Sequence, residues 1–136
     1  CHAGWRGAVN NIIEATISKM ETIGALRSGI TAIIGPAIQK DSYEIGDDVA
    51  NIIQSCSFFK KNELILSHKK PNKYLFDLPL LLKQCLKNAM IRNIGDVKID
   101  TYKNNDLFFS YRRSTHKNLK QAQKTGRQIS VIGILN

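Results

Sequence analysis

The sequence predicts an α+β fold in which a mixed sheet is covered by helices. Early in the chain, short apolar runs typical of strands alternate with segments of helical periodicity. Later, strand-like runs follow one another with only turns between them. The length of 136 residues suits one domain or a large part of one, and no repeat or linker divides it.

The chain opens on a glycine-containing turn, Cys1-His2-Ala3-Gly4-Trp5-Arg6-Gly7. Apolar residues then recur at helical spacing from Val9 to Met20, and Gly24 is a natural helix end. We expect His2 to end a preceding strand and residues 4–8 to start this helix. Backbone N–H groups at a helix start attract anions, and Arg6 would add a guanidinium beside them.

The middle of the chain contains further strands and one helix. Residues 30–34 are apolar and β-branched, which predicts a strand buried on both faces. Residues 47–56 predict a helix with acidic residues in its first turn and a core face of Val49, Ile52 and Ile53. Residues 64–66 resemble a short edge strand, and residues 74–76 a better one.

Asp77 marks the clearest local signal. It is a favourable N-cap and Pro79 fits the first turn of a helix. The apolar stripe of this helix consists of Leu78, Leu81, Leu82, Cys85, Leu86 and Ala89.

The last third is predicted to be mostly strand and loop. We expect strands at residues 97–99, 107–113 and 128–135, a turn at 104–106 and a polar loop at 114–124. The aromatic strand 107–113 would end in the pair Arg112-Arg113.

Composition restricts the class of protein. The net charge is +9, but the lysines are spread along the chain without interleaved aromatic residues, so we expect no nucleic-acid partner. No apolar run is long enough to cross a bilayer, so we expect no membrane partner. The three scattered cysteines favour a reducing compartment, and hence a cytoplasmic location.

Five ordered motifs resemble the YfiH family, also called the laccase-domain or multicopper polyphenol oxidase family. They are His2-Ala3-Gly4-Trp5-Arg6-Gly7, Ile34-Gly35-Pro36-Ala37-Ile38, Ser42-Tyr43-Glu44-Ile45-Gly46, Phe108-Phe109-Ser110-Tyr111-Arg112-Arg113 and Thr125-Gly126-Arg127-Gln128. Details such as Asp100-Thr101-Tyr102 are similar to its alphaproteobacterial branch. Because the sequence begins with Cys inside the first motif, we expect residues 1–136 to be the C-terminal part of a single domain.

The resemblance implies a layered αββα sandwich, here incomplete at its N-terminus. It implies a cytosolic zinc enzyme with purine nucleoside phosphorylase activity on adenosine, inosine or guanosine with phosphate, and in some members adenosine deaminase activity. The family's metal site uses two His and one Cys. His2 matches one His, and the other two ligands lie upstream in family members. Cys1 is not expected to replace them, because neighbours on a strand point to opposite faces.

The remaining site residues are hypotheses. Arg6, Arg112 and Arg113 are candidates for holding phosphate, and Phe109 and Tyr111 for stacking on a purine. Arg6 could instead lock the turn, and only one of Arg112 and Arg113 need face the site. His116 could approach the same site. Alternative functions are a cytoplasmic peptidoglycan-precursor editing enzyme and an inactive truncated fragment. The oligomeric state is left open.

Overall fold

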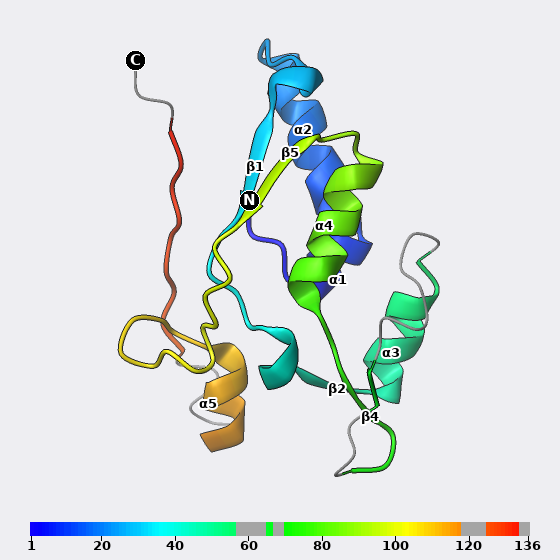
Figure 1. Ribbon diagram of the computed structural model, residues 1–136, viewed down its shortest axis with the longest axis vertical. Coiled ribbons are helices and arrows are strands. Elements are labelled where there is room, and N and C mark those ends of the chain that lie inside the picture. Colours follow the sequence, from blue (N-terminus) through cyan, green and yellow to red (C-terminus); the bar gives the residue numbers. More distant parts are fainter. Residues whose placement is uncertain (57–64, 67–69, 118–124, 134–136) are drawn as a thin grey trace.

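The computed structural model describes residues 1–56, 70–117 and 125–133, together with the backbone of 65–66. Helices and two small sheets make up these residues, so the α+β class is confirmed (Figure 1). Parallel and antiparallel pairing both occur, but in separate sheets rather than in one mixed sheet: a parallel pair β1-β5 and an antiparallel sheet of order β2-β4-β3. None of the helices in this part of the chain is long and apolar enough to cross a membrane.

The parallel pair joins distant parts of the sequence. β1 (Thr31–Ile34) pairs with β5 (Asn93–Asp96), with Thr31 opposite Asn93. The expected burial of the first strand on both faces is wrong. Ile34 is buried, but Ile33 is 45% exposed and lies over Gly95. A Cβ on Gly95 would be 2.6 Å from Ile33 Cδ1, so a larger residue there would displace the end of this side chain.

The first helix is broken into two. α1 (Trp5–Val9) starts within residues 4–8, as expected, but α2 (Ile12–Thr22) follows only after a break at Asn10-Asn11. Asn11 has a φ of 66°, a left-handed conformation that interrupts a helix and that Asn tolerates well. The chain then passes through Gly24, as expected, into the short helix η1 (Arg27–Gly29).

The antiparallel sheet follows. The short helix η2 (Lys40–Ser42) leads into β2 (Glu44–Gly46), which pairs with β4 (Lys73–Leu75), and β3 (Ile65–Leu66) forms an edge as predicted. α3 (Asp47–Gln54) is confirmed, with Ile53 fully buried. Ile52 is 46% exposed, so its assignment to the core face is wrong, and Ala50 is buried instead.

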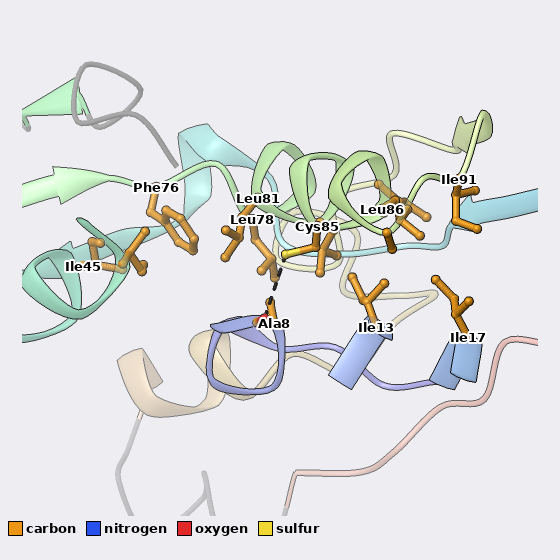
Figure 2. Packing of buried hydrophobic residues seen from close by; sticks show 14 of the residues in the cluster. Ala8, Ile13, Ile17, Ile45, Phe76, Leu78, Leu81, Cys85, Leu86 and Ile91 are labelled. Carbon is orange, nitrogen blue, oxygen red and sulfur yellow. Dashed lines mark hydrogen bonds between the residues drawn. The ribbon is translucent and has the colours of Figure 1, made fainter. Parts of the chain in front are cut away.

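α4 (Leu78–Asn88) is the central helix, as the sequence predicts. The Asp77 carboxylate accepts a hydrogen bond of 2.9 Å from the Leu80 backbone N–H and caps it. Its whole predicted apolar stripe is buried. Figure 2 shows α4 packed over α1 and α2, with the Cys85 thiol donating to the Ala8 carbonyl oxygen at 3.9 Å. Burial raises the pKa of Cys85 to about 11, so this cysteine is a neutral core thiol.

The end of the chain differs most from expectation. β5 lies earlier than the predicted strand 97–99, where Lys98 has a positive φ of 54°. The predicted strand 107–113 is wrong: residues 107–110 form a turn and a non-regular segment, and α5 (Tyr111–Lys117) begins after them and also replaces the first residues of the predicted loop. The physical reason is Ser110, whose buried hydroxyl accepts from the Arg113 N–H at 3.3 Å and starts the helix.

Residues 128–133 are extended but form no strand with other described residues, so the predicted last strand is wrong there. Parts of three predicted elements lie outside the described residues. They are the end of the last strand (134–135), most of the polar loop (118–124) and the first residue of the edge strand (Leu64).

Candidate functional site

His2 lies in the non-helical residues that precede α1, not at the end of a described strand. Its side chain is exposed, and its Nε2 atom is 3.7 Å from the position of a Cβ on Gly4. Cys1 is also exposed, and the alternation that would point it away from His2 does not apply here.

The described residues contain no group of three or more His, Cys, Asp or Glu side chains placed to hold a metal. His2 can therefore supply one imidazole nitrogen, but the donor set that a three-ligand zinc site needs is not complete within these residues. The residues present do not by themselves fit the implied metal.

Two arginines from opposite ends of the sequence approach Tyr43. Tyr43 follows η2 and is half-buried, with its ring 5.4 Å from that of Phe76. The Arg112 guanidinium carbon lies 5.2 Å from the Tyr43 ring centroid, and Arg6 lies over Trp5 at 4.9 Å. Neither arginine has a carboxylate partner among the described residues.

The positive charges of both arginines act on the Tyr43 hydroxyl. Burial raises the pKa of Tyr43 above its ordinary value, while the positive charges of Arg112 and, more weakly, Arg6 act in the opposite direction. Burial prevails, so the hydroxyl is protonated at neutral pH and can donate a hydrogen bond. Arg6, Tyr43 and Arg112 together form a cationic cluster of hydrogen-bond donors, which we call the arginine–tyrosine cluster.

Arg113 has a different role from its neighbour. Its guanidinium donates to the carbonyl oxygens of Thr101 at 2.7 Å, Tyr102 at 2.8 Å and Phe108. These bonds attach α5 to the loop before it. With its donors directed at backbone carbonyls, Arg113 supports the position of Arg112 in this structure.

Asp100 connects this loop to Tyr43. Its buried carboxylate accepts from the Ser42 hydroxyl at 2.6 Å and from the Tyr102 N–H at 2.8 Å. Because Ser42 directly precedes Tyr43, a continuous set of hydrogen bonds links the Tyr43 backbone to the loop that carries α5 and Arg112.

The two predicted purine platforms are exposed. Phe109 is 55% exposed, and its ring covers Gly126, where a Cβ would lie 2.6 Å from a ring atom. Its N–H donates to the Gln128 side-chain oxygen at 2.8 Å. Tyr111 is 68% exposed. No contact of either ring with the arginine–tyrosine cluster is seen, so stacking on a purine stays a prediction.

His116 lies one turn after Arg112 on α5 and pairs with Tyr102. Its Nδ1 is 2.9 Å from the Tyr102 hydroxyl oxygen, and the rings are nearly perpendicular. Two surface hollows of about 230 and 520 Å³ lie beside α4 and are lined by none of the predicted site residues.

Tyr43 belongs to one of the five sequence motifs, but the sequence analysis does not predict it as a site residue. The available signal was the position of Tyr43 in Ser42-Tyr43-Glu44, between two predicted elements, with no apolar periodicity to explain the aromatic ring. The hydrogen bonds of Asp100 and Arg113 join segments that are not adjacent in sequence. The spacing of residues within one segment therefore cannot predict them.

The family model described as multi-copper polyphenol oxidoreductase laccase matches residues 1–135. The chain belongs to this family. The description of this laccase family implies that its members bind a metal. A purine nucleoside phosphorylase of Rickettsia conorii is 40% identical over 115 residues, which are 85% of this chain and 47% of the relative.

Two further relatives agree with this placement. An adenosine deaminase from an unknown prokaryotic organism is 32% identical over 114 residues, 82% of this chain and 43% of that protein. The crystal structure of a hypothetical YfiH protein of Bacillus licheniformis superposes with a TM-score of 0.72 at 30% identity, covering 83% of this chain and 43% of that one. This member of the laccase family thus spans about half the length of the relatives that it matches.

Proposed function

We propose that this chain forms one part of the active site of a purine nucleoside phosphorylase, an enzyme of the cytoplasm. The observation that carries the proposal is the arginine–tyrosine cluster, in which Arg112 lies over the Tyr43 ring and the charge of Arg6 also acts on its hydroxyl. Neither arginine pairs with a carboxylate of the described residues. Arginine guanidinium groups bind phosphate oxygens through charge-assisted, often bidentate hydrogen bonds. The relative named purine nucleoside phosphorylase supplies the second support.

In the proposed reaction, phosphate is held between Arg6 and Arg112 and receives a hydrogen bond from Tyr43. One phosphate oxygen forms a bond to the ribose C1′ as the C1′–N9 bond breaks. The electron pair of that bond leaves with the purine, which takes up a proton from water. The products are the free base and ribose 1-phosphate. The cluster contributes by fixing the nucleophile near the sugar and holding its charge.

For the metal we propose zinc, with His2 as one ligand. His2 directly precedes the turn that carries Arg6, which would bring the metal close to the bound phosphate. Bound there, zinc would supply Lewis-acid polarisation of the substrate, which is why the loss of His2 is expected to abolish turnover. A three-ligand site would need at least one further ligand from outside the described residues.

A chimaera tests the proposal. The 136-residue chain replaces the matched half of the Rickettsia conorii relative, and the zinc-loaded protein is incubated with inosine and phosphate. We expect release of hypoxanthine, and loss of it with His2→Ala. Arg6→Gln and Arg112→Gln should each raise the KM for phosphate about 10- to 100-fold, since each removes charged hydrogen bonds of about 1.5–3 kcal/mol. The KM for inosine should change much less.

The matched control is Lys103→Gln, which removes an exposed cation from the loop before α5. If the parent relative is active and the chimaera releases no hypoxanthine, the proposal is wrong. Adenosine deamination is a second candidate, favoured by the relative that carries that name. Release of ammonia from adenosine without phosphate would identify it.

A further inference from the structure

Asp100 is a buried carboxylate that joins two segments of the chain. It is 8% exposed and forms no salt bridge with another described residue. Its Oδ2 accepts from the Ser42 hydroxyl at 2.6 Å, and its Oδ1 accepts from the Tyr102 N–H at 2.8 Å. Burial of a charge is costly unless hydrogen bonds stabilise it, so this carboxylate needs the donors from both segments.

On one side of this carboxylate, Tyr43 is held by the core. Ser42 ends η2, and Tyr43 follows it directly. The Tyr43 carbonyl oxygen accepts from the Phe76 N–H at 2.8 Å, and the two rings pack at 5.4 Å. Because Phe76 is fully buried, Tyr43 has a fixed place beside the antiparallel sheet.

On the other side, α5 is held by the loop that precedes it. α5 lies apart from α3 and α4 (Figure 1). The Arg113 guanidinium donates to the carbonyl oxygens of Thr101 and Tyr102. His116 Nδ1 lies 2.9 Å from the Tyr102 hydroxyl oxygen. These contacts attach α5 firmly to the loop, so the position of Arg112 on α5 follows the position of the loop.

Two contacts join the loop to the segment that carries Tyr43. The first is a backbone bridge, in which the Thr101 N–H donates to the Ala37 carbonyl oxygen at 3.2 Å. It lies upstream of η2. The second is the Asp100–Ser42 bond, which reaches the residue next to Tyr43. This second contact therefore determines how α5 and its arginine lie relative to the tyrosine ring.

We propose that Asp100 is a positioning residue for phosphate and that it fixes Arg112 relative to Tyr43. The inference rests on the proposed function, in which these two residues bind phosphate. A guanidinium binds phosphate best in a defined, often bidentate geometry, and a site keeps such geometry only when a layer of supporting hydrogen bonds holds its side chains. Asp100 itself does not contact the phosphate, because like charges repel each other.

Ser42→Ala tests the inference, because it removes the bond to Asp100 and leaves the Tyr102 N–H bonded. The zinc-loaded chimaera with the Rickettsia conorii relative is titrated with inorganic phosphate by calorimetry. We expect the variant to bind phosphate about 3- to 30-fold more weakly, as for other residues that act through a neighbour. In an Arg112→Gln background the same change should weaken binding less than about twofold, since the arginine to be positioned is gone.

A pair of Asp100 variants separates positioning from general damage to the fold. Asp100→Ala should weaken phosphate binding as Ser42→Ala does, and Asp100→Asn should restore it. The Asn oxygen can accept from the Tyr102 N–H, and its NH₂ group can donate to the Ser42 oxygen. Urea denaturation shows whether each variant is folded. If Asp100→Ala does not fold, Ser42→Ala in the two backgrounds decides.

Thr16→Val is the matched control. The Thr16 hydroxyl donates to the Ile12 carbonyl oxygen at 2.8 Å within α2, so the change removes a half-buried hydrogen bond of the core helices. Its phosphate affinity should equal that of the parent.

Three results would overturn the inference: unchanged affinity in Ser42→Ala, equal weakening with and without Arg112, or equal weakening by Thr16→Val. Hypoxanthine release is measured separately. A parent chimaera that is active, with a Ser42→Ala variant of equal phosphate affinity, overturns the positioning alone. Weaker phosphate binding in that variant, without hypoxanthine release by the parent, supports the positioning and overturns the phosphorylase. Absence of phosphate binding by the parent at millimolar concentrations overturns both.

Discussion

Adjacent residues on α5 have unlike roles. Arg112 lies over Tyr43, whereas Arg113 donates to backbone carbonyls of the preceding loop. Consecutive residues on a helix point about 100° apart, so one of the pair faces the site and the other the loop. Had residues 107–113 been a strand, the same pair would have pointed to opposite faces of a sheet. The sequence alone could indicate that one arginine faces the site, but not which one.

Replacement of Arg113 by Lys should destabilise the fold although the charge is kept. A lysine ammonium group cannot reach three carbonyl oxygens in the planar arrangement that the guanidinium provides. We expect a loss of about 1–3 kcal/mol in the free energy of unfolding, measured by urea denaturation. Arg112→Lys should cost less than about 0.5 kcal/mol, as is usual for substitutions away from such bonds. Equal losses for the two variants would contradict this assignment.

At the scale of single site residues, Arg6 and Arg112 are candidates that the sequence offers, Arg6 from its place beside His2 in a glycine-containing turn and Arg112 from its place in an arginine pair. Their roles in binding phosphate stay predictions. Tyr43 is not among these candidates, because its proposed role depends on two arginines that are distant in sequence. The stacking roles of Phe109 and Tyr111 stay predictions.

At the scale of elements, prediction succeeded where the signals are local and complete. α4 has a cap at Asp77, Pro79 in its first turn and an apolar stripe, and all of these agree with the structure. The prediction of strands failed after residue 96. Many apolar residues there are exposed to solvent, so their spacing does not reflect packing against a core. Apolar and β-branched composition predicts a strand, but a strand forms only when a partner supplies its hydrogen bonds.

The contact between α4 and β5 should make stability depend on pH. Lys83 Nζ lies 2.8 Å from the Asp96 carboxylate, which is 7% exposed and also accepts from the Lys98 N–H at 2.9 Å. Burial alone would raise the pKa of Asp96, but these two hydrogen bonds outweigh it and hold the pKa below its ordinary value. The stabilisation is therefore fully present above the unfolded pKa of about 3.9 and is lost as the pH falls through the lower folded value.

Asp96→Asn should remove this dependence. We expect the variant to be less stable than the wild type by about 1–2 kcal/mol near neutral pH, and the difference to shrink as the pH approaches about 3. Urea denaturation at a series of pH values measures it. Asp106→Asn is the control, because Asp106 is exposed and, within the described part of the chain, its carboxylate accepts only from the side chain of its neighbour Asn105. A difference that grows on acidification would show that the sign is wrong.

At the scale of the whole molecule, the described core is one-sided. Its buried cluster extends from α1 and α2 through α4 to the antiparallel sheet, as Figure 2 shows in part. The α+β class and the family followed from the sequence. The separation into two sheets did not, because periodicity identifies strands but contains no information on which strands pair.

This one-sided core predicts a gradient of local stability. In the isolated chain, amides in the second half of α4 should exchange slowest, since Leu81, Cys85 and Leu86 are buried beneath them. Amides of residues 127–133 should exchange at nearly the rate of an unstructured peptide. Hydrogen exchange of the chain alone measures both. Comparable protection in the two regions would mean that residues 127–133 already have a partner within this chain.

The pairing of Thr31 with Asn93 has a consequence for synthesis on the ribosome. β1 leaves the exit tunnel first, and β5, its strand partner among the described residues, follows about 60 residues later. At 5–20 residues per second, this takes roughly 3–12 s, during which an apolar β-branched segment is exposed to other nascent chains. Closure of such a long loop is also entropically slow compared with forming a helix. The newborn chain is thus most vulnerable to aggregation between the emergence of β1 and that of β5, a period in which a chaperone would protect it best.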